Sequence, residues 1–204
     1  MAIVNGYADL ATVKAAARIT DDIDDTLLEL AIESSSRLID GHCQRHFYVT
    51  TSESRYYVAD NSYACTIDDV AGASITVETS SGVDGVYDET WTANDFQRQP
   101  LNRISAGLAF PTNKLIAVQD YLFPTSPIGE TTVKVTAAFG FATAIPTDVV
   151  QACVLMSLRQ FKRFDSPLGA AGFGDGIGIV MVRKFDPDIN AMLAPYRRNV
   201  VGVA

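Results

Sequence analysis

The chain has 204 residues, of which 48% are hydrophobic and 20% are charged, and these values are ordinary for a globular protein. No apolar run approaches the roughly 18 residues that a membrane-spanning helix needs, and the first residues lack the basic and apolar regions of a secretory signal. The three cysteines are far apart and form no CxxC pair, which argues against a disulfide scaffold or a zinc ribbon. Reduced, buried cysteines in a protein made in the cytosol are expected instead.

The formal net charge of −8 is unevenly spread along the chain. Residues 1–100 contain 17 acidic and 6 basic residues, whereas residues 101–204 contain 7 acidic and 10 basic residues. An acidic majority argues against a protein that wraps nucleic acid. The division indicates either that the two halves face different neighbours, or that copies pack acidic face against basic face. Two ordinary solvated faces are an equally acceptable interpretation.

Two helices are expected near the N-terminus, over residues 9–19 and 22–43. Asp9 is suited to cap the first helix, since its carboxylate can accept the free N–H groups of the first turn. The second helix carries apolar or small residues at helical spacing, which predicts one buried stripe. The members of that stripe are Ile23, Leu27, Leu28, Leu30, Ala31, Ser34, Ser35, Leu38 and Ile39. The run Ser34-Ser35-Ser36 places small side chains in this helix, which favours close approach of another helix.

From Phe47 onward the composition changes to Thr, Val, Tyr and Ser, interrupted by Gly and Asn, which is typical of short strands joined by turns. The expected strands are 47–51, 55–58, 64–67, 74–79, 90–93, 115–118 and 131–139. Residues 83–86 are a candidate hairpin tip. A small antiparallel sandwich or barrel is therefore predicted for this part of the chain.

Helix is expected to return at Pro146 and to continue to Phe164, with basic residues in its last turn, where the helix dipole favours them. A glycine-rich loop, a short apolar strand at 179–182 and a final helical segment at 189–193 follow. The predicted fold is therefore α+β. A helical module built from residues 1–46 and 146–204 is interrupted by an antiparallel β insert at 47–145.

Four groups of residues in this order resemble the head–tail connector (adaptor, or head completion) proteins of tailed bacteriophages. They are Tyr7-Ala8-Asp9-Leu10 with Val13-Lys14; Asp24-Asp25 with Leu27-Leu28, Leu38-Ile39-Asp40 and Cys43-x-Arg45-x-Phe47; Phe139-Gly140 with Ile145-Pro146-x-Asp148-Val149 and Ala152; and Asp186-Pro187-Asp188 with Leu193-x-Pro195-Tyr196-Arg197. Together they cover both helical ends, about half of the chain. The β insert contains no motif that matches the family.

The resemblance implies a virion structural protein without enzymatic activity or cofactor. It would be made in the host cytoplasm and would form a ring of twelve subunits in the neck between head and tail. The implied partners are the portal protein above and a head-closure or tail-completion protein below. Double-stranded DNA would pass through the channel without specific binding, and no membrane contact is implied. A head-closure protein or a minor tail protein with a β recognition domain is the alternative within the virion.

Residues able to carry chemistry are few. His42, Cys43 and His46 would suit a metal-dependent enzyme, but zinc requires at least one further ligand, and histidines near a helix C-terminus also suit the helix dipole. The glycine-rich loop follows a helix, precedes a strand and contains no lysine, so it does not fit a phosphate-binding loop. The sequence has no Gly-x-Ser-x-Gly motif. No catalytic or metal-binding residue is therefore assigned.

Two segments are predicted to contact partners. The residues expected to engage the portal are Arg183, Lys184, Tyr196, Arg197, Arg198, Val200 and Val201, where cations and apolar side chains would meet an acidic surface. The loop expected to order against a neighbouring subunit or the portal comprises Gly172, Phe173, Gly174, Asp175, Gly176, Ile177 and Gly178. Deletion of residues 184–204 is predicted to abolish portal binding and leave the fold intact.

Overall fold

A computed structural model describes residues 3–80, 85–102, 104–105, 108–164 and 186–198 of the chain. The chain forms two compact units. The helical unit contains residues 1–45 and 145–204, and the β unit contains residues 46–144. The predicted α+β class, with an antiparallel β insert between helical segments, is confirmed.

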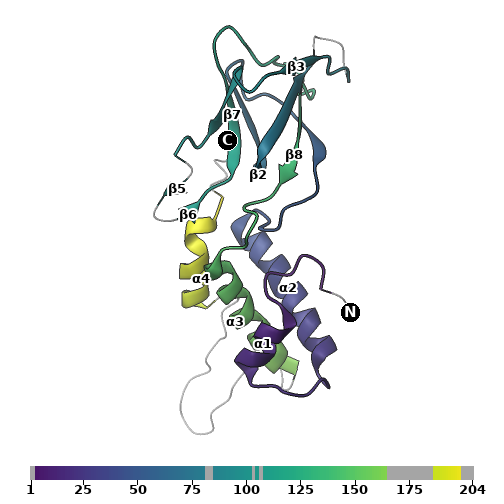
Figure 1. Ribbon diagram of the computed structural model, residues 1–204, viewed down its shortest axis with the longest axis vertical. Coiled ribbons are helices and arrows are strands. Elements are labelled where there is room, and N and C mark those ends of the chain that lie inside the picture. The colour runs from purple at the N-terminus through teal and green to yellow at the C-terminus, as the bar shows by residue number, and fades with distance from the viewer. Residues whose placement is uncertain (1–2, 81–84, 103, 106–107, 165–185, 199–204) are drawn as a thin grey trace. The chain divides into compact units, whose positions relative to one another are not determined.

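The helical unit contains four α-helices and one short 3₁₀ helix among the described residues (Figure 1). They are α1 (Leu10–Ala17), α2 (Asp25–Cys43), α3 (Thr147–Phe164), α4 (Pro187–Leu193) and η1 (Ala194–Tyr196). The ends of each α-helix lie within two or three residues of the predicted ones, whereas η1 was not predicted. Within the described residues, no helix has the length and apolar character required to cross a membrane.

One side-chain cap fixes the beginning of α1, and one lysine connects α1 to α2. Asp9 caps α1, because its Oδ1 accepts the Thr12 N–H at 2.6 Å and its Oδ2 accepts the Thr12 hydroxyl at 2.9 Å. These bonds to the ionised carboxylate lower the pKa of Asp9. Lys14 of α1 then contacts Asp22 and Asp25, each at 2.7 Å, and so connects α1 to the beginning of α2.

Small side chains allow α2 and α3 to pack closely. Ser36 of α2 lies 3.5 Å from the Cys153 sulfur of α3, and Ser157 of α3 donates to the Ala31 carbonyl at 3.5 Å. All four residues are buried. The predicted role of the serines in α2, close approach of another helix, is therefore seen at Ser36, whose hydroxyl also donates to the Ile32 carbonyl at 2.8 Å.

The β unit consists mainly of one six-stranded antiparallel sheet with the strand order β1-β8-β2-β7-β4, and β3 pairs with β2 outside this path (Figure 1). Its strands are β1 (Glu53–Tyr57), β2 (Ala64–Thr79), β3 (Glu89–Trp91), β4 (Phe96–Gln99), β7 (Thr112–Ala117) and β8 (Val133–Phe139). A separate two-stranded sheet pairs β5 (Ile104–Ser105) with β6 (Leu108–Ala109). The described strands do not close into a barrel, so that part of the prediction is corrected.

The largest difference from the prediction is β2, which is one long strand where the sequence predicts two strands, at 64–67 and 74–79. Its first part pairs with β7, its last part pairs with β3 and β8, and the register shifts on either side of Val70. The carbonyls of Gly72 and Ala73 accept hydrogen bonds from the Arg98 guanidinium at 2.6 and 2.7 Å. The strand therefore continues through an irregular stretch that resembles a turn in sequence.

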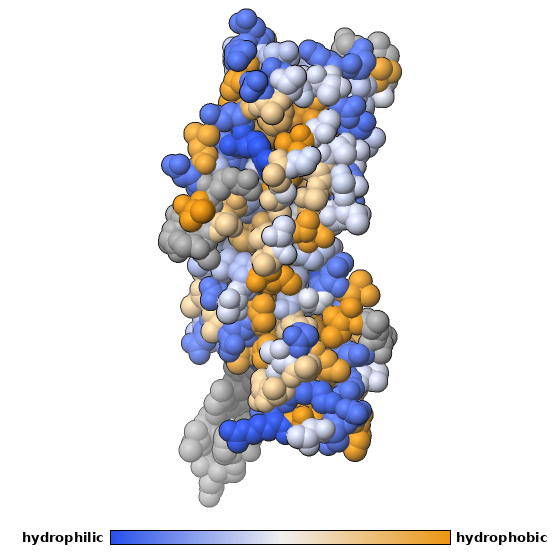
Figure 2. All heavy atoms as spheres, in the orientation of Figure 1, coloured by the Kyte–Doolittle hydropathy of each residue, from blue (hydrophilic) through white to orange (hydrophobic). Residues whose placement is uncertain are grey.

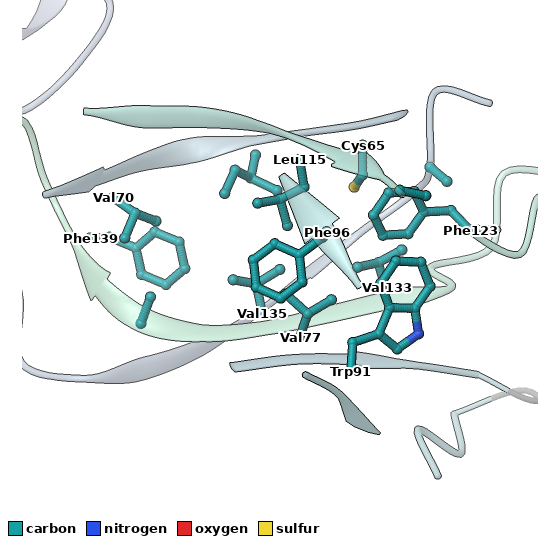
Figure 3. Close-up of a cluster of buried hydrophobic side chains, with 14 residues drawn as sticks. Cys65, Val70, Val77, Trp91, Phe96, Leu115, Phe123, Val133, Val135 and Phe139 are labelled. Carbon is teal, nitrogen blue, oxygen red and sulfur yellow. The ribbon is translucent and has the colours of Figure 1, made fainter. Parts of the chain in front are cut away.

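A single core forms where both parts of β2 contribute apolar side chains (Figure 3). Alternate residues of β8 point into it, as expected for a strand with one buried face. Trp91 stacks on Phe123 with ring centroids 4.5 Å apart and donates its indole N–H to Thr79 at 2.9 Å. The β unit therefore has a hydrophobic core of its own.

Three details of the β insert differ from expectation. Residues 47–51 form no strand, since Thr50 makes only one backbone bond to Phe139 there, at 2.8 Å. Strand β4 and the short pair β5–β6 were not predicted. The candidate hairpin tip at 83–86 lies partly outside the described residues, as 81–84 are not described.

Candidate assembly surface

The titratable groups with shifted pKa values are positioned for structure rather than chemistry. Burial raises the pKa of Cys43 to about 11 and that of Cys65 to about 12, so both are protonated thiols at neutral pH. Burial also raises the pKa of Cys153. Among the residues that the structure describes, no group of three or more His, Cys, Asp or Glu side chains is placed to hold a metal ion. His46, one of the three residues considered above as metal ligands with His42 and Cys43, hydrogen-bonds to the Tyr48 carbonyl at 3.0 Å.

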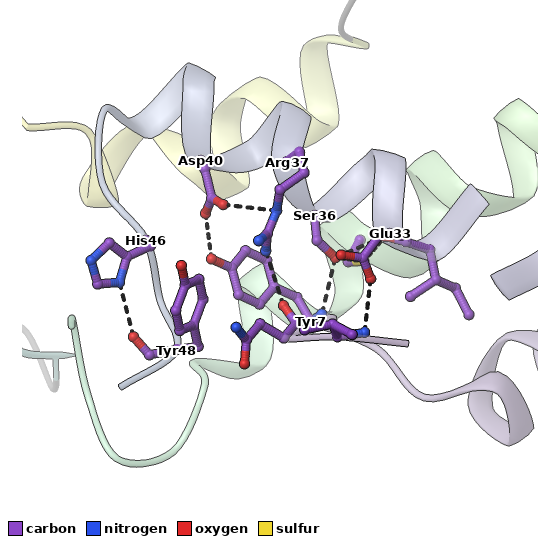
Figure 4. A network of polar contacts seen from close by, with 11 residues as sticks. Tyr7, Glu33, Ser36, Arg37, Asp40, His46 and Tyr48 are labelled. Atoms are coloured by element: carbon purple, nitrogen blue, oxygen red, sulfur yellow. Dashed lines mark hydrogen bonds and ion pairs between the residues drawn. The ribbon is translucent and has the colours of Figure 1, made fainter. Parts of the chain in front are cut away.

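A polar network attaches the N-terminal segment to α2 (Figure 4). The Tyr7 backbone N–H donates to Ser36 at 3.0 Å, and its hydroxyl donates to Asp40. Arg37 forms an ion pair with Asp40 at 3.1 Å, lies over the Tyr7 ring, and donates to the Asn5 carbonyl at 3.0 Å. The ring of Tyr7 is buried, so this network locks one end of the helical unit.

The C-terminal segment is locked in the same unit from the other end of the chain. Tyr196 is 1% exposed, and its hydroxyl donates to Asp148 of α3 at 3.2 Å. Burial, with the nearby Asp148 carboxylate, raises the pKa of Tyr196 to about 12. The Arg198 N–H donates to the Cys43 carbonyl at 2.9 Å. Arg159 of α3 forms an ion pair with Asp186 at 2.9 Å, just before α4.

The structure therefore places three of the predicted portal-contact residues. Tyr196 is a core residue with little accessible surface, Arg197 is exposed, and Arg198 is half-buried. The other predicted contacts, Arg183, Lys184, Val200 and Val201, lie outside the described residues, as does the whole glycine-rich loop from Gly172 to Gly178.

A groove of about 500 Å³ lies between α2 and the C-terminal half of α3. Its lining residues are Ser34, Leu38, Met156, Arg159, Gln160, Arg163 and Phe164. Phe164 is 59% exposed, and the two arginines supply positive charge. Lys162, also exposed, adds a third cation at the end of α3. The groove therefore combines an apolar lining with cations.

Helix α2 has a second apolar side that the unit does not bury. Leu27 and Leu30 are 37% and 45% exposed, and Ile23, in the turn before α2, is 87% exposed. The helix buries Leu28 and Ile32 instead. Apolar side chains are visible among polar ones on the face of the helical unit in Figure 2. An unburied apolar side on a folded unit indicates a contact surface.

Comparisons with known proteins identify a matching family and solved structures with a similar fold. Residues 7–74 match the family of phage gp6-like head-tail connector proteins. The resemblance found in the sequence is thereby confirmed over about a third of the chain. A search of curated proteins finds no match.

Solved structures extend the likeness to nearly the whole chain. A chain in a structure described as the neck of an empty GTA particle, computed with C6 symmetry, has a TM-score of 0.58 and 16% identity, with 99% of this chain and 96% of that chain covered. A chain from the neck of the native GTA particle, computed with C12 symmetry, has a TM-score of 0.54, 18% identity and the same coverage. A chain from the virion of the native gene transfer agent particle has a TM-score of 0.56, 18% identity and the same coverage. These likenesses show a shared fold.

The connector motifs occupy structural positions in this fold. Tyr7 and Asp40 form the N-terminal lock, Asp9 caps α1, and Tyr196 bonds Asp148. All these bonds hold the helical unit together. Several residues of the connector motifs therefore stabilise the unit, whereas others, such as Leu27 and Arg197, are exposed.

Sequence reasoning missed the groove and the exposed side of α2, because it assigned nine apolar or small residues to one buried stripe and omitted the buried Ile32. At about 100° per residue, that stripe spans about 180° of the helix circumference, from Leu30 round to Ile39. A single core-facing stripe needs only about 100°. The excess width was the signal that could have revealed a second apolar side.

Proposed function

We propose that this chain is a head–tail connector, a virion structural protein that forms a ring in the neck between head and tail. The observation that carries the proposal is the combination of the family match over residues 7–74 with a fold shared over 99% of the chain with neck proteins. The chain would act by surface complementarity, and no enzymatic activity is assigned to it.

The ring is supported by the neck structures, which were computed with C6 and C12 symmetry. Twelve copies are compatible with both symmetries, so a homo-oligomeric ring of twelve subunits is proposed. The net charge of −8 suits a ring through which DNA must slide, because phosphate groups would not be held tightly by an acidic protein.

The proposed partners are the portal protein on one side and a head-closure or tail-completion protein on the other. Arg197 and Arg198, with the neighbouring apolar residues Val200 and Val201, are the proposed portal contacts. They would meet an acidic surface, together with Arg183 and Lys184. Tyr196 is left out of this surface, since its side chain belongs to the core of the helical unit. The loop from Gly172 to Gly178 is proposed to contact a neighbouring subunit or the portal.

The test is the solution mass of the protein alone and after mixing with its portal, by light scattering and negative-stain imaging. A ring, formed alone or on the portal, is the expected result. A protein that remains monomeric up to high concentration and ignores the portal would refute the proposal. In that case, binding to a head-closure or tail protein would assign the chain to another part of the neck.

A truncation after Arg198 tests the portal contact separately, because it removes only residues 199–204. Portal binding should weaken while the helical unit stays folded. Full portal affinity in this variant would remove the tail from the interface. Stoichiometric zinc in the purified protein would revive a metal-dependent activity at His42, Cys43 and His46.

A further inference from the structure

An apolar ridge runs along the exposed side of α2. It consists of Leu27 and Leu30 of α2, which are three residues apart and lie on the same side of the helix, and of Ile23 in the turn before the helix. Ile23 is the most exposed large apolar side chain among the described residues, at 87%. A row of this kind is the shape that fits between two helices of another molecule.

Acidic side chains flank the beginning of the ridge. Asp22 and Asp25 share a single cation, Lys14, which contacts each of them at 2.7 Å. Asp21 and Asp24 form no ion pair with any residue in the described part of the chain. The ridge therefore presents apolar side chains next to uncompensated negative charge.

The groove between α2 and α3 has the opposite character. Met156, Leu38 and Phe164 give it an apolar lining, and Arg163 lies at the same surface. Within the described ranges, neither Arg163 nor Lys162 forms an ion pair. The ridge is therefore a protruding surface with negative charge beside it, and the groove is a hollow surface with positive charge beside it.

We propose that the ridge of one copy of this chain packs into the groove of the next copy. The inference rests on the proposed ring and names the subunit contact within it. A ring is built from head-to-tail contacts, in which each copy uses two different surfaces, one for each neighbour. The ridge and the groove occupy successive stretches of α2, the ridge around Leu27 and Leu30 and the groove around Ser34 and Leu38, and they are complementary in charge.

Cross-linking between two variants that each carry one introduced cysteine tests this contact directly. One protein carries Ile23→Cys in the ridge, and the other carries Gln160→Cys in the groove. The three native cysteines are buried and have raised pKa values, so they react slowly under mild oxidation at neutral pH. The variants are mixed under the conditions in which the wild type assembles, with or without portal, and far-UV circular dichroism checks that each is folded.

Disulfide-linked heterodimers in the mixture, far in excess of homodimers from either protein alone, are the expected result. A ring that forms without this cross-link overturns the inference and leaves the connector proposal standing. Homodimers of the Ile23→Cys protein alone would show a symmetric contact, which also overturns the head-to-tail arrangement. A chain that never assembles refutes the ring and this contact together.

Charge reversal gives a second, independent test. Asp21→Arg and Arg163→Asp should each weaken assembly by roughly tenfold, since each places like charges across the contact. The two variants mixed together should recover assembly, because the reversed charges then face each other. Asp120→Arg, at an exposed site of the β unit, is the matched control and should assemble like the wild type. Equal assembly of all four proteins would contradict the proposed contact.

Discussion

Deletion of residues 184–204 should unfold the helical unit, contrary to the expectation from the sequence. The deletion removes α4 and η1, and with them the buried side chains of Ile189, Leu193 and Tyr196. Burial of each such side chain contributes about 1.5–3 kcal/mol, so the loss is about 5–9 kcal/mol before the Tyr196–Asp148 bond is considered. Whole domains are stable by only about 5–15 kcal/mol.

The two units can be monitored separately in one urea titration. Trp91 is the only tryptophan and lies in the core of the β unit, so its fluorescence follows that unit. Far-UV circular dichroism at the helical band follows α1 to α4. The deletion should remove most of the helical signal or shift its midpoint to low urea, while the fluorescence transition keeps a folded baseline.

The truncation after Arg198 is the matched control, because it retains every described residue of α4 and η1. Its helical transition should coincide with that of the full chain. A helical midpoint unchanged by the longer deletion would refute the reasoning. It would mean that α4 adds little to the stability of the helical unit despite its buried side chains.

Four further predictions follow from individual residues. Gly140→Ala should destabilise the β unit by about 1–3 kcal/mol in the fluorescence transition, since φ is +145° and a Cβ would lie 2.2 Å from the Tyr48 carbonyl oxygen. Gly41→Ala, in α2 with nothing within 4 Å, should instead stabilise the helical unit by up to about 1 kcal/mol. Tyr7→Phe should cost the helical unit about 1–3 kcal/mol by circular dichroism, because Asp40 loses a buried donor; an unchanged midpoint would contradict the lock. The raised pKa values of Cys43 and Cys65 mean that the folded state favours the protonated thiols. Their contribution to stability is therefore complete below about pH 9 and is lost as the pH rises towards 11 for Cys43 and 12 for Cys65. A thiol reagent at pH 8 should react rapidly only after unfolding.

The helices could be predicted because their signals are local. Asp9 caps α1 through bonds to Thr12, and Pro146 stands directly before α3. Strand β2 could not be predicted as one element, because its continuity depends on Arg98, whose guanidinium binds two of its carbonyls from another strand. Contacts between residues distant in sequence decide where a strand bends and where it ends.

The candidate surfaces were predicted less well for a related reason. A cationic side chain at the end of a helix, such as Arg159, satisfies the helix dipole, pairs with a carboxylate or faces a partner, and composition does not distinguish these roles. Tyr196 resembled a contact residue because it is followed by two arginines, yet its ring fills the core. Only packing shows which side chains remain available to a partner.

The family match over residues 7–74 includes both the polar network around Tyr7 and the ridge, and the residues of these two features have different physical roles. Tyr7, Ser36 and Asp40, within the matched residues 7–74, bond to one another at fixed places in the fold, so substitution of one leaves a buried polar group without its partner. Ridge residues such as Leu27 and Leu30 need only be apolar and fit the groove that faces them. A contact of this kind tolerates change when both surfaces change together. The connector motifs therefore combine residues that hold the helical unit together, such as Tyr7 and Tyr196, with residues of the proposed contacts, such as Leu27 and Arg197.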